Sequence, residues 1–147
     1  MSKPIACLSF CISLLLLTLA APVSHAVIPA GEDIQADIAH SFIVGNTTLP
    51  PGKYHFRILQ GSDLNAMRVA SADGSTSVEF LVRPSIDNHR PTHTELVFIR
   101  YGKTEILKAV YVGGSKNGVA VIDPSREEAR LQKQGQKPNT HTEQESH

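Results

Sequence analysis

The chain has 147 residues, and its 14 basic and 14 acidic side chains give a formal net charge of zero. The charges are scattered singly, without the basic stripe that binds a phosphate backbone, so we expect no nucleic-acid partner. Hydrophobic residues make up 41% of the sequence. That share and this length suit one globular domain with its own core.

The first 26 residues are typical of a secretion signal. Residues 5–19 are almost wholly apolar, and Ser24–Ala26 places small residues at the positions that a signal peptidase reads. We therefore predict cleavage between Ala26 and Val27, export as a soluble protein to the periplasm or the exterior, and no membrane span once the signal is removed. Both cysteines, Cys7 and Cys11, lie inside the signal, so we expect no disulfide in the exported chain.

Apolar side chains recur at every second residue through most of the remaining chain. Residues 53–59, for example, place Tyr54, Phe56 and Ile58 on one face, which is the period of a half-buried strand. Asp73-Gly74 and Asn117-Gly118 are typical of two-residue hairpin turns. The predicted strands are 34–44, 53–59, 66–71, 76–83, 94–101, 105–112 and 119–122.

The pattern changes after residue 123. Ser125 followed by Glu128 matches a capping box, in which each residue bonds to the other's backbone amide, so we predict a helix over 126–133. Residues 134–147 contain no aliphatic side chain, and we expect them to be disordered. The chain should thus comprise a signal peptide (1–26), one β domain with a short C-terminal helix (27–133) and a tail (134–147).

These elements indicate an all-β fold, an antiparallel β-sandwich or small barrel of about seven strands with a short C-terminal helix. A parallel α/β fold would need crossover helices between its strands, and the only helical pattern follows the last one. An open sandwich presents unpaired strand edges, which leaves room for edge-strand pairing with another chain.

The loop from Pro84 to Thr94 carries the candidate site residues. Asp87, His89 and His93 offer oxygen and nitrogen ligands for a divalent metal. The four-residue spacing of the two histidines is helical, but Pro91 between them disfavours a helix. We therefore interpret the segment as a solvated loop and assign no metal, cofactor or catalytic residue.

One further histidine interrupts an apolar face. His40 occupies an even position of the strand predicted over 34–44, where its neighbours at that spacing are apolar. No second ligand lies two or four residues away, so we interpret His40 as a core or rim histidine with one hydrogen bond. His141 and His147 fall in the tail, where they are weak evidence for a metal.

Three segments carry a resemblance to a known family: 42–54 (FIVGNTTLPPGKY), 96–102 (LVFIRYG) and 124–130 (PSREEAR). They resemble the landmarks of a family of small exported proteins, frequent in acidobacterial soil bacteria, that share a Leu-Pro-Ala-Gly-x-Tyr motif. The chain departs from that pattern at Pro51, at Ala39-His40 and at Tyr111, where the family commonly has alanine, Pro-Phe and tryptophan. The resemblance implies a small exported β protein and carries no activity with it.

Three functions remain open from the sequence. A non-catalytic exported module, acting in binding or in the cell envelope, is favoured because the sequence lacks a Gly-x-Ser-x-Gly elbow and a His-Glu-x-x-His motif, and its cysteines fall in the signal. An extracellular hydrolase would use the 84–94 loop. A small-molecule carrier would need a cavity inside the barrel.

Overall fold

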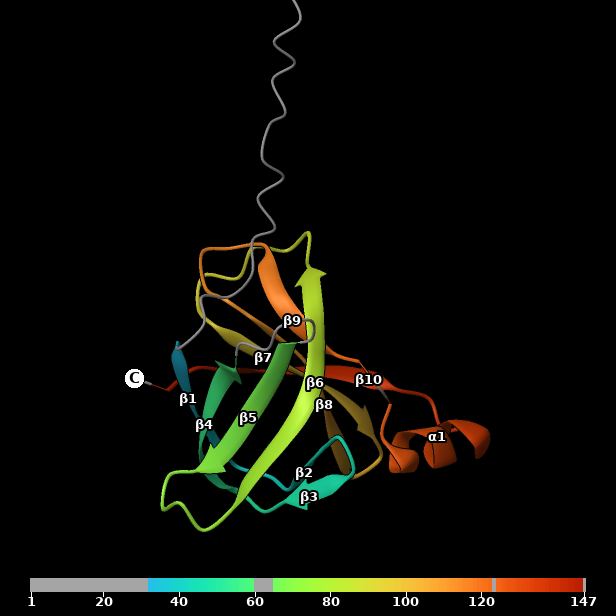
Figure 1. The fold of residues 1–147 in the computed structure, drawn as a ribbon. Helices are drawn as coiled ribbons and strands as arrows, with labels where there is room; N and C mark the ends of the chain where they lie inside the picture. Colours follow the sequence, from blue (N-terminus) through green and yellow to red (C-terminus); the bar gives the residue numbers. More distant parts are fainter. Residues whose placement is uncertain (1–31, 60–64, 123, 147) are drawn as a thin grey trace, which may run out of the picture.

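The computed structural model describes residues 32–59, 65–122 and 124–146 of the chain (Figure 1). The predicted signal and its cleavage position lie outside these residues. Within them, no helix is long and apolar enough to cross a membrane. The described elements are β1 Asp33–Ile38, β2 Phe42–Val44, β3 Thr47–Leu49, β4 Gly52–Leu59, β5 Asn65–Ser71, β6 Ser77–Ile86, β7 Glu95–Tyr101, β8 Thr104–Tyr111, β9 Asn117–Val121, α1 Arg126–Lys133 and β10 Asn139–Gln144.

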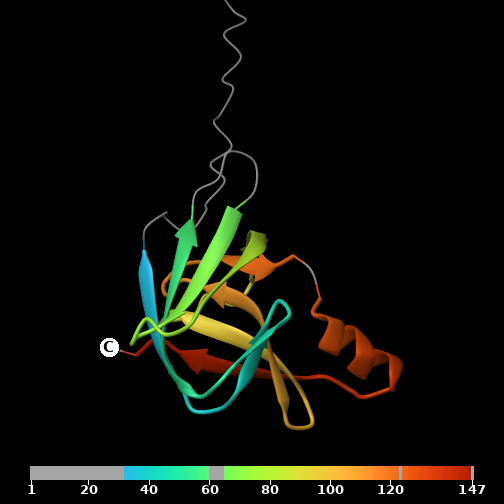
Figure 2. The ribbon, with the colours of Figure 1, turned by 60° about the horizontal axis from the view of Figure 1, so that its bottom comes forward.

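The strands form one curved sheet. Its path runs β1-β4-β5-β6-β9-β8-β2-β3, and β7 joins β8 to β10 as a branch. Every pair is antiparallel except β2 with β8. The sheet curls until β10 returns to β1, where the Ser146 N–H donates to the Gln35 carbonyl at 2.9 Å. Figure 2 shows this curl, with the C-terminal end beside β1 and α1 standing at the far side.

β8 is the junction of the sheet. One of its edges pairs along its length with β7. The other edge is divided, because Glu105 and Ile106 lie beside β2 while residues 109–111 lie beside β9. The β2–β3 hairpin is thereby carried on the first half of β8, next to the turn that joins β7 to β8.

Aromatic side chains from three strands meet in the core. Phe42 lies edge-on to Tyr54 and to Phe98, with ring centroids 5.2 and 5.7 Å apart. Phe42 and Phe98 are at most 1% exposed, and aliphatic residues of the inward strand faces fill the space around them. The other members of this core include Ile34, Ile38, Val44, Leu49, Phe56, Met67, Val69, Leu96, Leu107 and Val119.

The predicted all-β fold with a short C-terminal helix is confirmed, with more strands than expected. The strand predicted over 34–44 is interrupted at residues 39–41, which separates β1 from β2. The connection 45–52 contains a strand of its own, β3, because Gly45 adopts a φ of 58° and permits a two-residue turn at 45–46.

The second predicted hairpin turn is displaced. Asn117 and Gly118 belong to β9, and the chain reverses over residues 113–116, where Gly114 has a φ of 74°. Gly118 is needed in the strand for another reason: a Cβ built on it would lie 2.4 Å from the Tyr111 ring and 2.4 Å from the Val110 carbonyl oxygen.

The predicted loop from Pro84 to Thr94 begins later than expected. β6 continues to Ile86, and Pro84 is paired in it with Val119 of β9. The prediction was wrong here because β5, described from Asn65, pairs with β6 only up to Val82, so no described strand lies beside Pro84 on that edge of β6. A proline is tolerated in a strand where the edge facing its nitrogen has no partner.

The expectation of a disordered tail was also wrong. Residues 139–144 form β10, which pairs with β7 from Asn139 opposite Arg100 to Gln144 opposite Glu95. Strand addition depends on backbone hydrogen bonds and needs no aliphatic side chain. The polarity of the tail therefore indicated exposure of its side chains rather than absence of structure.

The predicted helix 126–133 is confirmed as α1. Ser125 caps it, and its Oγ accepts from the Glu128 N–H at 3.0 Å. The carboxylate of Glu128, expected to return a bond to the cap, instead accepts from Lys108 Nζ at 3.0 and 3.2 Å. This ion pair and the buried side chain of Leu131 attach α1 to the sheet.

Candidate functional site

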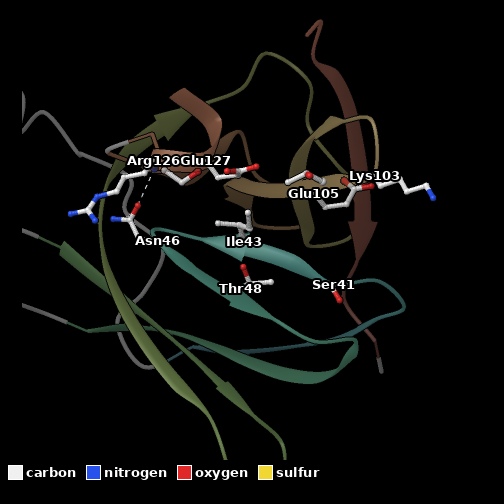
Figure 3. Close-up of a pocket in the computed structure, with 10 residues that line it drawn as sticks. Ser41, Ile43, Asn46, Thr48, Lys103, Glu105, Arg126 and Glu127 are labelled. Carbon is white, nitrogen blue, oxygen red and sulfur yellow. Dashed lines mark hydrogen bonds between the residues drawn. The ribbon is translucent and has the colours of Figure 1, made fainter. Parts of the chain in front are cut away.

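A polar cleft lies between the β2–β3 hairpin and the first turn of α1, with the β7–β8 turn on its third side (Figure 3). Its volume is about 480 Å³, within the range of small-molecule sites. Ile43 is its one aliphatic lining residue among those the structure describes; the others are Ser41, Asn46, Thr48, Lys103, Thr104, Glu105, Ser125, Arg126 and Glu127.

The cleft is held open by a contact between residues 80 positions apart. Asn46, in the β2–β3 turn, accepts the Arg126 N–H at 2.9 Å through Oδ1. This bond satisfies one of the amides that a helix leaves unpaired at its start. It also fixes the distance between the hairpin and α1, which form two walls of the cleft (Figure 3).

The charges around the cleft are balanced. Lys103 and Arg126 oppose Glu105 and Glu127, and in Figure 3 the two cationic side chains extend away from each other at opposite ends. Hydrogen bonds from Arg130 lower the pKa of Glu127. Glu127 is therefore ionised and engaged on α1, while Glu105 is engaged by Arg100 through one of its two oxygens.

Glu105 is the most unusual of the lining residues because it is only 3% exposed. Its Oε1 accepts from Arg100 Nε and lies 3.5 Å from His141 Nδ1. Its Oε2 is buried and has no hydrogen-bond partner within the described structure. A buried carboxylate oxygen without a donor is unfavourable by about 1–3 kcal/mol or more, so a donor brought to this atom would be stabilising.

A second polar group lies across Glu105, away from the cleft. His40, between β1 and β2, meets His141 and Glu143, which share one face of β10. His40 Nδ1 is 3.2 Å from Glu143 Oε1, and His141 Nε2 is 3.9 Å from the same oxygen. Over residues 32–59, 65–122 and 124–146, this is the only group of three potential metal ligands found close enough to share an ion.

The predicted loop candidates are not assembled into such a group. Asp87 Oδ1 accepts from the His89 N–H at 3.0 Å, and the Asp87 N–H donates to the Lys116 carbonyl at 2.9 Å. Both contacts organise the loop itself. His89 and His93 are exposed, and no third ligand joins them within the described segments.

The sequence predicted a core or rim histidine with one hydrogen bond at position 40; the structure has His40 half-buried, paired with Glu143, and these distant partners were not predicted. Those partners lie about a hundred residues further along the chain, so inspecting only positions two and four residues away did not find them. The available signal was the spacing of His141 and Glu143, since residues two apart share one face of a strand.

Comparison of the chain with protein-family models, with curated proteins and with solved structures gave no match.

Proposed function

We propose that the protein is an exported, non-catalytic binding module that takes a small, neutral, hydroxyl-rich molecule in the polar cleft. The observation that carries this proposal is the unpartnered, buried Oε2 of Glu105 beside the cleft. A ligand hydroxyl would supply the missing donor. The signal-like N-terminus supports export.

The lining of the cleft favours a neutral ligand over an ion. Two cations and two carboxylates leave no net charge, and serine, threonine and asparagine side chains offer both donors and acceptors. Hydroxyl groups also act in both roles, so a polyhydroxylated molecule can use this mixed lining without a charge of its own.

The same lining argues against catalysis in the cleft. Acid–base hydrolysis needs two groups free to exchange protons with a substrate. Glu127 is held by Arg130 and Glu105 by Arg100, and the described lining contains no histidine, cysteine or aspartate. The hydrolase alternative receives little support from the 84–94 loop, where Asp87 is engaged in the turn.

The carrier alternative is less supported than a surface site. The inward faces of the strands are filled by three phenylalanines and by aliphatic side chains that are almost fully buried. An apolar ligand would have to displace this packing, which is unfavourable in a close-packed core.

The proposal is tested by titrating the protein with glucose and with N-acetylglucosamine at millimolar concentrations, followed by backbone amide NMR. We expect shifts confined to residues 41–48, 103–105 and 125–127, and about tenfold weaker binding for Glu105→Gln, because the amide offers one acceptor in place of two. Glu79→Gln is the matched control, since Glu79 is an exposed carboxylate paired with Arg68 outside the cleft. Absence of shifts with both sugars, or shifts outside these segments, would refute the proposal.

A further inference from the structure

We propose that His40, His141 and Glu143 form a binding site for one divalent transition-metal ion, with zinc as the best fit. The three side chains come from opposite ends of the described chain and meet where β10 returns to the corner between β1 and β2. The three ligands lie outside the lining of the cleft, which shares only the supporting residue Glu105 with this site, and the proposal does not depend on the function proposed for the cleft.

The distances between the ligand atoms are close to those a zinc ion needs. Two ligands at about 2.1 Å from a tetrahedral zinc are about 3.4 Å apart. One atom from each of the three residues lies within 4.8 Å of the others, and Glu143 Oε1 is 3.2 Å from His40 Nδ1 and 3.9 Å from His141 Nε2. Small side-chain rotations would bring the three atoms to coordination distance.

The chemistry of the ligand set selects the class of metal. Two imidazoles and one carboxylate suit zinc and its neighbours, whereas magnesium and calcium prefer oxygen ligands alone. The side chains of His40, His141 and Glu143 are 24%, 30% and 18% exposed, so solvent can deliver the ion. A water molecule can complete a four-coordinate site.

In many zinc sites the histidine nitrogen that does not bind the metal is held by a hydrogen bond, and His141 has a carboxylate placed for such a bond. Metal-bound histidines usually donate their other N–H to a carboxylate, which orients the ring. With Nε2 on the ion, His141 Nδ1 would donate its proton to Glu105 Oε1, 3.5 Å away, in place of accepting from Arg100 Nη2, 3.2 Å away. Arg100 Nε donates to the same carboxylate oxygen, so Glu105 acts as a positioning residue.

The rings of both histidines also rest against the core. His40 lies edge-on to Phe98 with ring centroids 5.5 Å apart, and the His141 ring is 6.3 Å from Phe98. Phe98 is fully buried. It limits the positions that the two imidazoles can adopt, which reduces the conformational entropy lost when they bind an ion.

His40 adds a second indication. Its Nε2 is buried and has no hydrogen-bond partner in the described structure, while its Nδ1 faces Glu143. A histidine fully used by hydrogen bonds would have partners on both nitrogens. The ring is therefore held on one side only, by Glu143 and Phe98, and Nδ1, which faces the carboxylate, is the nitrogen available to an ion.

The proposal is tested by isothermal titration of the purified protein, free of any polyhistidine tag, with Zn²⁺ and by the visible absorption of its Co²⁺ complex. We expect one ion per chain, tetrahedral cobalt bands, and a higher thermal unfolding midpoint with zinc, because the ion binds only the folded arrangement. His141→Ala and Glu143→Gln should each lower zinc affinity by more than about 100-fold, and Glu105→Gln by about 10–100-fold.

The matched control is His55→Ala. His55 also pairs with a carboxylate, Asp33, at 2.9 Å, but no third ligand joins that pair within the described residues, so its loss should leave zinc affinity unchanged. His141 and Glu143 lie on an edge strand outside the apolar core, and circular dichroism will show that their variants remain folded. Failure of the parent protein to bind zinc, unchanged affinity in the folded His141→Ala variant, or an equal loss in His55→Ala would each overturn the proposal.

Discussion

Replacing Gly118 with alanine should be among the most damaging single-methyl additions in the described structure. Gly118 lies in β9 opposite Tyr111 of β8, and its new Cβ would meet the Tyr111 ring and the Val110 carbonyl oxygen, each at 2.4 Å. A side-chain ring can rotate aside, but a backbone oxygen within a paired strand cannot do so without distorting the ladder. Displacing the ring would also break the 3.0 Å contact between Tyr111 Oη and Ser85 Oγ.

The expected loss follows from these two effects. Overpacking usually destabilises by about 1–3 kcal/mol, and a lost hydrogen bond adds about 1 kcal/mol. We therefore expect the free energy of unfolding to fall by about 3 kcal/mol, which for a domain of this size lowers the thermal midpoint by about 10 °C. Urea denaturation followed by circular dichroism measures both the loss and the denaturant dependence.

The control is Gly52→Ala, at the start of β4. A Cβ there would lie 3.6 Å from Tyr54 Cε2, an ordinary contact, and Gly52 has no positive φ. This change should alter stability by less than about 0.5 kcal/mol. A second comparison, Gly118→Ala in a Tyr111→Ala background, separates the ring clash from the carbonyl clash. A loss below about 1 kcal/mol for Gly118→Ala, or an equal loss for Gly52→Ala, would refute this reasoning.

Three further predictions concern α1 and the β5–β6 turn. Leu131→Ala should remove hydrogen-exchange protection from residues 126–133 while β7 keeps it, because an eight-residue helix is marginal without its buried contact; retained protection would contradict this. Lys108→Met should lower the free energy of unfolding, measured in urea, by about 2–3 kcal/mol, because it leaves the buried Glu128 carboxylate without its cation. The double variant Lys108→Met with Glu128→Leu should recover most of that loss. No recovery would argue against the ion pair as the cause. Hydrogen bonds from Ser71 and Ser75 lower the pKa of Asp73 to about 2. Because the pKa of this carboxyl in the unfolded chain is near 4, the contribution of Asp73 to stability is present above pH 4 and lost as the pH falls towards 2. Carboxyl NMR and acid unfolding of Asp73→Asn will check this prediction. Titration of Asp73 near pH 4 in the folded protein would contradict it.

The features that were predicted from the sequence are those decided by interactions between residues close together in the chain. The alternation in 53–59 fixes which face of β4 is buried, since a shift by one residue would bury His55 and Arg57. The helix 126–133 follows from its cap. Both depend on side chains within a few residues of one another, and both appear as predicted.

The features that were missed depend on pairing between distant segments. β10 forms because β7 offers an unpaired edge. The sequence of residues 139–144 does not by itself indicate this pairing. Pro84 is tolerated because, among the described residues, β5 pairs with β6 only up to Val82. The histidine cluster and the cleft arise in the same way, from the return of β10 to β1 and from the contact of Asn46 with α1.

β10 follows every other described strand in the sequence, and this order has a consequence for folding. β7 presents Leu96 and Phe98 to the core and has half-buried Val97 and Ile99 on its other face. Without β10, its unpaired edge would therefore be prone to pair with strands of other chains. During synthesis from the N-terminus, that edge stays open until residues 139–144 emerge. β10 thus shields the edge of an apolar strand, and the interval before it docks is one in which the protein is vulnerable to aggregation.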